Sequence, residues 1–306
     1  MMKSWLLMLQ CMLLVVTMAT ASGCGSRVGG VRFYVQRGRT LGQSSYTVGS
    51  ARNIPDAYLR GTKIHLLIHG WKGRSNLMER LGYQLYRGNK GPVIQVDWSR
   101  WSGNANILTY KPACARTTNV GAEVAAFIRA LESRGYHLSN MHLIGWSLGG
   151  KVSAAAGACL RGQVGRITGL DTPLYCSTDK RLTGPRLDTS DAQFVDTIRT
   201  TVLSGAHFQE QGHADFFVGC EVSRTNCFCP QRLAPLTIGE RHSDAVNIFK
   251  NSINDRNCQI RFNKACDCPR ARCTSSLNTM GYPATKPSEN RKYLTFMAGS
   301  WLHCKQ

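Results

Sequence analysis

The stretch Met141-His-Leu-Ile-Gly-Trp-Ser-Leu-Gly-Gly-Lys151 decides the fold of this 306-residue chain. An apolar run ends at Ile144, the turn Gly145-Trp-Ser-Leu-Gly149 follows, and a helix rich in small residues continues to Leu160. This order is typical of a tight strand-to-helix turn that holds a serine at its apex in a strained backbone conformation. Glycine is expected on either side because a Cβ atom there would collide with the neighbouring strand or helix. Ser147 is therefore a candidate nucleophile, since the pentapeptide stands in the strand and helix context that the motif requires.

Strand and helix patterns alternate on both sides of this turn. Continuous apolar runs predict buried strands, and apolar residues at helical spacing predict amphipathic helices. The predicted strands are Ile64–Ile68, Val93–Asp97, Arg166–Leu170 and Phe194–Ile198, with an edge strand at Val31–Val35, and the predicted helices are Asn76–Tyr86, Asn119–Leu131 and about His242–Ile253. The alternation predicts an α/β fold with a mostly parallel central sheet that helices cover on both faces. Reactive groups in such sheets lie beyond the carboxyl ends of the strands.

A serine hydroxyl needs a neighbouring imidazole to take its proton, and that imidazole needs a carboxylate to fix its tautomer. Among the eight histidines, His242 fits best because it follows both Ser147 and the candidate acids, and it is expected to open a helix from a loop. Two other histidines lie in apolar strands, where hydrogen-bonded core residues are expected: His65 and His142. For the acid, Asp171 and Asp196 both stand on strands after the turn, and position alone leaves the two open.

Segments spread over nearly the whole chain resemble, in order, the pancreatic-lipase-like family of secreted lipases. The matching segments are Ile68-His-Gly-Trp71, Val96-Asp-Trp-Ser-Arg100, Asn119-Val-Gly-Ala-Glu-Val-Ala-Ala-Phe127, His142-Leu-Ile-Gly-Trp-Ser-Leu-Gly149, Ile167-Thr-Gly-Leu-Asp171, Arg186-Leu-Asp-Thr-Ser-Asp-Ala-Gln-Phe-Val-Asp196, Gly212-His-Ala-Asp-Phe216, Met280-Gly-Tyr282 and Tyr293-Leu-Thr295. The resemblance implies an α/β-hydrolase fold and assigns the acid to Asp171 and the base to His242. The backbone N–H groups of Trp71 and Leu148 match the positions of the oxyanion hole beside Ser147.

Three positions depart from the pattern of this family. Trp146 stands where a histidine is usual, Arg199 replaces another usual histidine, and no cysteine immediately precedes His242. The last departure predicts that the disulfide flanking the lid is rearranged, through Cys227 or Cys229. The resemblance also implies a structural role for the segment that contains His213, and we interpret His69 as a residue that orients its loop.

The first residues have the layout of a secretory leader. Lys3 precedes the apolar run Trp5–Val16, which is too short to span a bilayer, and Ala19-Thr-Ala21 supplies a small-residue cleavage site. We therefore expect a signal peptide at 1–21, a secreted extracellular protein, and a single lipase-like α/β-hydrolase domain at 22–306 without a C-terminal β-sandwich. Of the 13 cysteines, Cys11 lies in the leader, so an even number remains for disulfides. The cysteine spacings do not fit a structural zinc site, and we expect neither a metal nor a cofactor.

The formal net charge is +20, which is high for a secreted protein. Such a charge predicts attraction to anionic surfaces, either acidic phospholipid or sulfated glycans. The basic residues are scattered and no nucleic-acid-binding motif accompanies them, so we expect no nucleic-acid partner. A solvated, solubilising surface is the alternative that the sequence leaves open.

Two loops suggest the substrate. The segments at 217–242 and 200–212, which should hold the lid and a second surface loop, are shorter than expected for triglyceride lipases. By resemblance, short loops accompany members that cleave phospholipid at the first acyl position, because an open cleft admits a polar head group. We therefore expect a carboxylic ester hydrolase that acts on glycerolipid, an A1-type phospholipase, at a membrane or lipid–water interface through a Ser-His-Asp acyl-enzyme mechanism. The alternatives are a triglyceride lipase or galactolipase, and, in another class, a lipase-like lipid- or glycan-binding protein without catalysis.

Overall fold

The structure is a computed structural model of the chain, and it describes residues 24–174, 176, 184–201, 209–219, 221–222, 227–228, 238–267 and 272–295. The expected leader at 1–21 lies outside these residues. So does 229–237, the part of the expected lid segment that contains Cys229. Within the described ranges, no helix is long and apolar enough to cross a bilayer.

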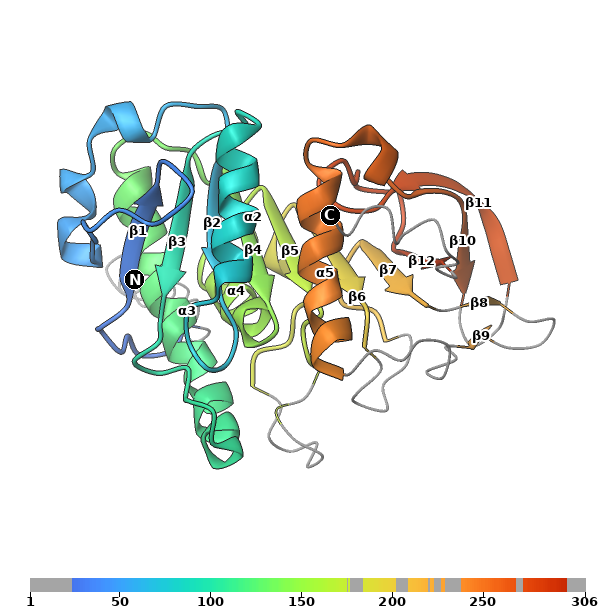
Figure 1. The fold of residues 1–306 in the computed structure, drawn as a ribbon, viewed down its shortest axis with the longest axis horizontal. Coiled ribbons are helices and arrows are strands. Elements are labelled where there is room, and N and C mark those ends of the chain that lie inside the picture. The colour runs from blue at the N-terminus through green and yellow to red at the C-terminus, as the bar shows by residue number, and fades with distance from the viewer. Residues whose placement is uncertain are drawn as a thin grey trace, which may run out of the picture.

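An eight-stranded sheet forms the centre of the described part of the chain (Figure 1). Its strand order is β1-β3-β2-β4-β5-β6-β7-β12. The strands are β1 (Arg32–Gln36), β2 (Ile64–Ile68), β3 (Val93–Asp97), β4 (Met141–Trp146), β5 (Arg166–Leu170), β6 (Phe194–Arg199), β7 (Ala214–Val218) and β12 (Arg291–Thr295). The edge strand β1 pairs antiparallel with β3, and every other neighbouring pair in this sheet is parallel. The predicted mostly parallel sheet is confirmed.

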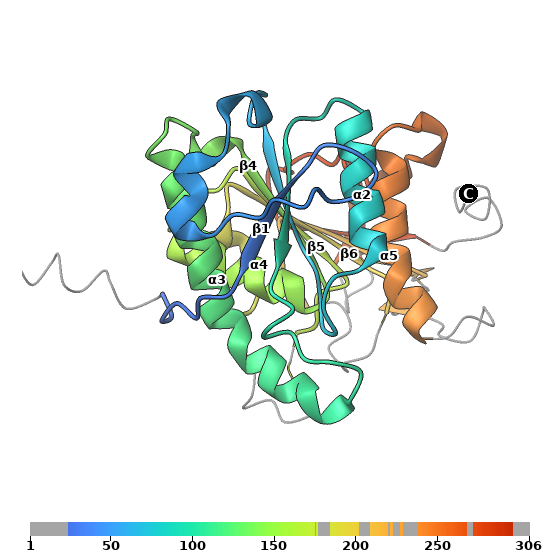
Figure 2. The ribbon, with the colours of Figure 1, turned by 60° about the vertical axis from the view of Figure 1, so that its left-hand side comes forward.

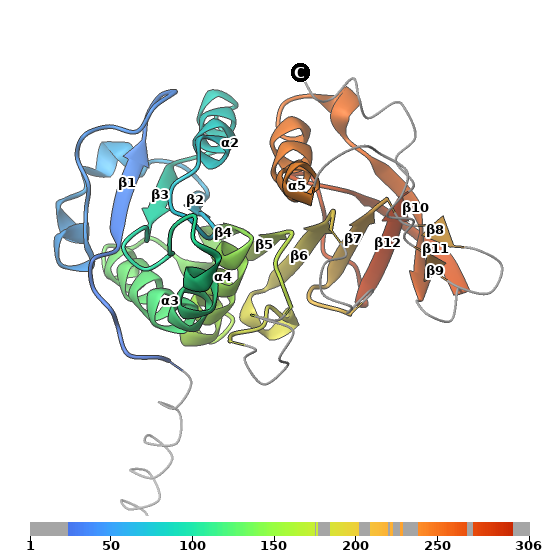
Figure 3. The ribbon, with the colours of Figure 1, turned by 60° about the horizontal axis from the view of Figure 1, so that its bottom comes forward.

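Helices cover both faces of the sheet, as predicted (Figures 2 and 3). Helices α3 (Tyr110–Glu132) and α4 (Leu148–Cys159) lie together on one face, and α2 (Asn76–Arg87) and α5 (Ile238–Ser252) lie together on the other. Each face has its own apolar core. On the first, Phe33 of β1 stacks on Phe127 of α3 with ring centroids 3.7 Å apart. Burying a side chain of this size contributes about 1.5 to 3 kcal/mol, so these cores fix the helices against the sheet.

Two helices begin earlier than their apolar patterns predict. Helix α3 starts at Tyr110 rather than Asn119. The buried positions of its first turns, Ala113, Cys114 and Thr117, are small or polar side chains, so the apolar pattern did not reveal them. Helix α5 starts at Ile238, so His242 lies inside the helix rather than at its opening. The buried positions of α5 among residues 241–252 begin only at Ala245, which is why the pattern placed the start too late.

The C-terminal part adds strands that the sequence patterns did not reveal. They are β7 and β12 of the main sheet, the short pair β8 (Glu221–Val222) and β9 (Cys227–Phe228), and the hairpin β10 (Arg261–Asp267) and β11 (Arg272–Thr279). Phe262 of the hairpin packs on Tyr293 of β12 with ring centroids 5.5 Å apart. Three disulfides join pairs of described residues: Cys24–Cys159, Cys114–Cys176 and Cys266–Cys273. The expected disulfide bonding is confirmed, and Cys266 and Cys273 pair with each other instead of binding zinc.

His65 and His142 lie in the core, as predicted. The Nε2 atom of His65 lies 3.1 Å from the Lys90 carbonyl oxygen, and the Nε2 atom of His142 lies 2.8 Å from the Thr168 hydroxyl. Burial lowers the pKa of His65 to about 4 and holds the pKa of His142 well below its ordinary value. Both imidazoles are therefore neutral at neutral pH.

We expect the free energy of unfolding to fall as the pH drops from about 6.5 towards about 4. In this window the unfolded chain binds protons at His65 and His142 that the folded core rejects, so acid favours unfolding, by up to roughly 3 kcal/mol for His65. Asp191 acts in the opposite direction because burial raises its pKa to about 7. Urea unfolding of wild type and of His65→Gln at pH 4.5 and 7 isolates the contribution of His65 to the pH dependence of the free energy of unfolding. A wild-type pH dependence no steeper than that of the variant would contradict this assignment.

Candidate active site

Ser147 stands at the apex of the turn between β4 and α4. Its backbone has φ 56° and ψ −125°, a strained combination for a residue with a side chain, and its N–H donates to the Leu170 carbonyl oxygen at 2.9 Å. A Cβ atom on Gly145 would lie 2.5 Å from the nitrogen of Gly150, and one on Gly149 would lie 2.7 Å from the His69 carbonyl oxygen. The predicted need for glycine at both positions is confirmed.

The loop after β2 comes directly against the serine. Strands β2 and β4 are neighbours at the point where the strand order reverses, and ligand sites of α/β sheets form at such points. A Cβ atom on Gly70 would lie 2.8 Å from Ser147 Cβ and 3.3 Å from Ser147 Oγ. Trp71 follows Gly70, and Leu148 is the first residue of α4, whose leading N–H groups have no acceptor within the helix. Both predicted oxyanion donors therefore belong to segments that touch Ser147.

His69 fixes the shape of this loop. Its Nε2 atom accepts the Trp98 backbone N–H at 3.1 Å, so its proton is on Nδ1, which donates to the Gly70 carbonyl oxygen at 2.8 Å. The indole of Trp98 stacks on the imidazole and donates to the His69 carbonyl oxygen at 2.7 Å. These contacts give His69 the predicted loop-orienting role and occupy both of its ring nitrogens.

The structure brings Asp171 and His242 together, at 2.6 Å between Oδ2 and Nδ1. Asp171 follows β5 with φ 48° and is held in place by Thr200 and Thr201. The two threonine backbone N–H groups donate to Oδ1 at 3.1 Å, and the Thr201 hydroxyl donates to Oδ2 at 2.7 Å. These three hydrogen bonds fix the orientation of the Asp171 carboxylate. Donation from Nδ1–H to Asp171 leaves the Nε2 atom of His242 as the basic nitrogen.

Asp196, the other candidate acid, is engaged elsewhere. It is fully buried, and both of its oxygens accept from the Arg166 guanidinium, at 2.8 and 2.9 Å. The Thr168 hydroxyl donates to it as well. This fork-to-fork pair ties β5 to β6, so Asp196 is a structural residue.

Trp146, which the sequence showed only as a departure from a usual histidine, touches the candidate base. Its indole N–H donates to the His242 carbonyl oxygen at 3.1 Å, and the two ring centroids are 5.2 Å apart. Because Trp146 directly precedes Ser147, this contact joins the serine turn to α5. Among the described residues Ser147 Oγ forms no hydrogen bond to His242, and catalytic hydrogen bonds are often long before substrate binds.

Replacing Trp146 by phenylalanine is expected to lower kcat/KM for a soluble ester roughly five- to tenfold. The phenyl ring keeps most of the packing but loses a hydrogen bond worth about 1 kcal/mol that positions the His242 backbone. Trp101→Phe is the matched control, because the Trp101 indole donates to the Gly29 carbonyl oxygen at 2.9 Å away from His242. Equal effects of the two changes, or no effect of Trp146→Phe, would contradict a positioning role.

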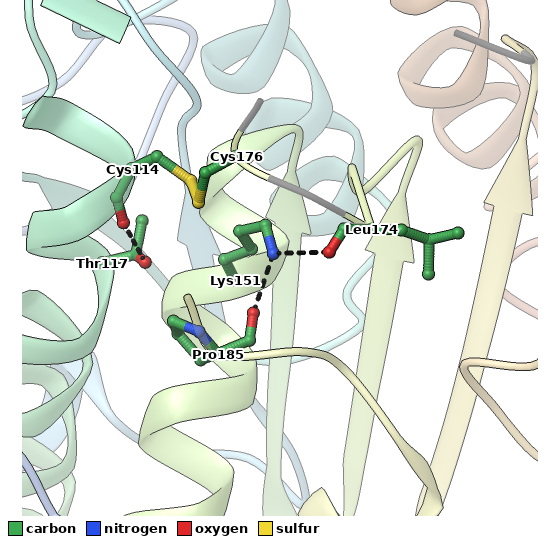
Figure 4. Close-up of a disulfide and its surroundings, with 6 residues drawn as sticks. All are labelled: Cys114, Thr117, Lys151, Leu174, Cys176 and Pro185. Atoms are coloured by element: carbon green, nitrogen blue, oxygen red, sulfur yellow. Dashed lines mark hydrogen bonds between the residues drawn. A yellow bond between two sulfur atoms is a disulfide. The ribbon is translucent and has the colours of Figure 1, made fainter. Parts of the chain in front are cut away.

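Lys151 and a disulfide anchor the loop that leaves Asp171 (Figure 4). Lys151 is buried on α4, and its ammonium group donates to the carbonyl oxygens of Leu174 at 3.1 Å and Pro185 at 3.0 Å. The Cys114–Cys176 disulfide ties the same loop to α3. Burial lowers the pKa of Lys151 to about 8, so the group is mostly charged below that pH. No role for Lys151 could be predicted from the sequence, because the two acceptors named above are backbone carbonyls that are distant in the chain.

Other positions singled out in the sequence have structural contacts. His213 Nδ1 accepts the Val195 backbone N–H at 3.0 Å, which agrees with its structural assignment. Arg199 is buried and donates to the Gln209 carbonyl oxygen at 3.1 Å. The predicted lid disulfide lies outside the described residues: Cys229 is not described, and only the backbone of Cys227 is. In the described ranges no group of three or more His, Cys, Asp or Glu side chains is arranged to hold a metal ion.

Comparisons with known proteins indicate the family of this chain. The family model named Lipase matches residues 49–228. Pancreatic triacylglycerol lipase of Mus musculus is 36% identical over 189 residues, which are 58% of this chain and 39% of that protein. Pancreatic lipase-related protein 2 of Bos taurus is 40% identical over 166 residues, 51% of this chain and 34% of that protein. The chain thus matches less than half the length of these relatives. A solved α/β hydrolase, MGS-M1 from a Medee basin deep-sea metagenome, aligns with a TM-score of 0.37 at 11% identity, covering 58% of this chain and 68% of its own, a likeness too weak to add to the argument.

The sheet order and the glycine-flanked serine turn define an α/β-hydrolase fold. With more than half of its residues matched by the family model, the chain belongs to the lipase family. His242 lies beyond the matched residues 49–228, so its assignment depends on its contact with Asp171.

Proposed function

We propose that this protein is a carboxylic ester hydrolase that acts on glycerolipid with Ser147 as nucleophile, His242 as base and Asp171 as the acid that orients it. The observation that carries the proposal is the 2.6 Å contact between His242 Nδ1 and Asp171, formed beside the strained turn that presents Ser147. A carboxylate and an imidazole so paired are the partners that a serine hydroxyl needs to become a nucleophile.

In the proposed reaction, His242 Nε2 takes the hydroxyl proton while Ser147 Oγ attacks the ester carbonyl carbon. The negative charge moves to the carbonyl oxygen, where the N–H groups of Trp71 and Leu148 and the positive end of α4 stabilise it. His242 then gives its proton to the leaving alcohol oxygen, and the acyl group remains on Ser147. Water, deprotonated by the same imidazole, releases the fatty acid and restores the serine.

Within this class we infer an A1-type phospholipase. The support is the short segments 217–242 and 200–212, together with the net charge of +20, which favours approach to anionic membrane. The alternative that the relatives favour is triglyceride hydrolysis, because those named above include a pancreatic triacylglycerol lipase. A galactolipase would need the same open cleft as a phospholipase.

Secretion is part of the proposal. The Cys24–Cys159, Cys114–Cys176 and Cys266–Cys273 disulfides support maturation in an oxidising compartment. We infer that residues 1–21 are removed as a signal peptide and that residues 22–306 form one hydrolase domain.

A lipid panel tests the proposal. The secreted protein is given phosphatidylcholine, a galactolipid and triolein in separate assays, and released fatty acid and lysolipid are measured. We expect the protein to release fatty acid and 2-acyl lysolipid from phosphatidylcholine. Cleavage of triolein alone would contradict the phospholipase hypothesis and favour a triglyceride lipase. If the protein cleaved neither a lipid of the panel nor a soluble ester, the result would favour the non-catalytic lipid- or glycan-binding protein.

A further inference from the structure

The amino-terminal end of α3 carries two aliphatic side chains that project into solvent. Ile107 is 68% exposed and Leu108 is 78% exposed, in a short 3-10 turn (Ile107–Thr109) that leads into the helix. This end of α3 extends past the carboxyl edge of the sheet, the edge on which Ser147 lies (Figures 1 and 2). Two adjacent aliphatic side chains so exposed would gain free energy by entering an apolar environment.

The turn is held rigidly in this shape. Asn106 Oδ1 accepts the Leu108 N–H at 3.0 Å, and the Thr109 hydroxyl donates to the Asn106 carbonyl oxygen at 2.7 Å. Asn104 Oδ1 in turn accepts the Asn106 N–H at 2.9 Å. Polar side chains therefore satisfy the backbone of the turn, and the two aliphatic side chains remain outside. We refer to residues 104–111 as the docking tip.

The docking tip contacts the loop that follows β2 and carries Trp71 and Lys72, which we call the oxyanion loop. The Trp71 indole N–H donates to the Thr109 hydroxyl at 3.1 Å, and the Trp71 and Tyr110 rings meet edge to face with centroids 5.5 Å apart. Gly103, with φ 77°, lets the chain pass close to Trp71, because a Cβ atom there would lie 2.7 Å from the indole nitrogen. A surface that receives Ile107 and Leu108 would thus lie next to the loop that contacts Ser147.

The charge around the tip indicates what that surface is. From residue 98 to residue 122 the chain carries three basic residues, Arg100, Lys111 and Arg116, and no acidic residue. Lys72, on the oxyanion loop, adds another exposed cation, with its Nζ atom 4.5 Å from the Trp71 ring centroid. Aliphatic side chains surrounded by cations match a bilayer whose anionic head groups cover an apolar interior.

We propose that Ile107 and Leu108 insert into an anionic lipid bilayer and that Lys111, Arg116 and Lys72 bind its head groups, which seats the bilayer beside Trp71 and Ser147. This docking surface rests on the proposed lipid hydrolysis, because it states how a bilayer is presented to that site. A second copy of the chain is the competing occupant of the two aliphatic residues.

The test separates docking from catalysis by using the Ser147→Ala chain throughout. Flotation measures its binding to vesicles of phosphatidylcholine alone and of phosphatidylcholine with phosphatidylglycerol. Changing Ile107 and Leu108 to serine is expected to weaken binding to the anionic vesicles at least tenfold. Changing Lys111 and Arg116 to glutamine is expected to weaken it roughly fivefold per charge, with a loss that shrinks in high salt. Leu277→Ser is the matched control, because Leu277 is 83% exposed on β11 and is expected to leave binding unchanged.

A second variant reports insertion directly. Ile107→Trp is expected to give a fluorescence spectrum that moves to shorter wavelength with anionic vesicles, whereas the spectrum of Leu277→Trp is expected to stay unchanged. Binding that survives the double serine change, or that Leu277→Ser weakens equally, would overturn the proposal. So would equal binding to both kinds of vesicle, or a dimer that the serine changes convert to a monomer without any effect on vesicles. If the proposed function alone failed, wild type would cleave no ester while the Ser147→Ala chain still bound.

Discussion

Ser147→Ala is expected to lower kcat for ester hydrolysis by at least several thousand-fold, and by roughly a millionfold if the three residues act as a unit. The loss is large because the proposed reaction needs a nucleophilic hydroxyl at the apex of the turn between β4 and α4, and alanine supplies none. Hydrolysis of a soluble ester by the purified protein measures it, and a fluorophosphonate that labels wild-type serine should leave the variant unlabelled. The alanine also removes little bulk from a tight site, so the unfolding midpoint should change little.

Ser153→Ala is the matched control for this change. Ser153 lies on α4, is also buried, and donates its hydroxyl to the Gly149 carbonyl oxygen at 3.0 Å. It is a buried serine like Ser147, but it lies inside α4 rather than at the turn. A Ser147→Ala protein that kept more than about a tenth of wild-type activity, or that lost no more than Ser153→Ala, would refute the nucleophile.

The sequence predicted the strands of the central sheet well wherever burial is continuous. Ile64–Ile68, Val93–Asp97 and Arg166–Leu170 agree residue for residue with β2, β3 and β5. The first is a nearly continuous apolar run, as expected of a strand buried on both faces, and the alternation with helices indicated the other two. The glycines at 145 and 149 were predictable for a related reason, since the close approach that they permit belongs to the turn itself. The hairpin β10–β11 was not predictable, because most of its described side chains are exposed and apolar and polar residues alternate only weakly along it.

Only part of the candidate site could be predicted from the sequence. The pairing of Asp171 with His242 joins residues that are 71 positions apart, and chain order alone left Asp196 as a rival. What separates the two acids is the Arg166 guanidinium, which a strand pattern does not reveal. Trp146 and Lys151 were also missed as contacts, because each acts through the backbone carbonyl of a distant residue and any residue can supply a carbonyl.

The second large effect is expected at the acid. Asp171→Asn should lower kcat for a soluble ester by roughly ten-thousandfold at neutral pH, because an amide presents a donor where His242 Nδ1–H and the Thr201 hydroxyl both need an acceptor. The asparagine either repels the imidazole or forces it into the tautomer that places the proton on Nε2, where no base then remains for Ser147. Steady-state rates per molecule that reacts with fluorophosphonate, measured from pH 6 to 9, quantify the loss.

Asp196→Asn separates a catalytic carboxylate from one that only holds the fold. Asp196 is as buried as Asp171 but faces Arg166, so its replacement leaves a guanidinium without its paired charge and should lower the free energy of unfolding by about 3 to 5 kcal/mol. Its rate per folded molecule should stay within about tenfold of wild type. If Asp196→Asn lost activity as deeply as Asp171→Asn while remaining folded, or if Asp171→Asn kept near wild-type rates, the pairing of Asp171 with His242 would be structural rather than catalytic. That outcome would leave Ser147 without the oriented base on which the proposed acyl transfer depends.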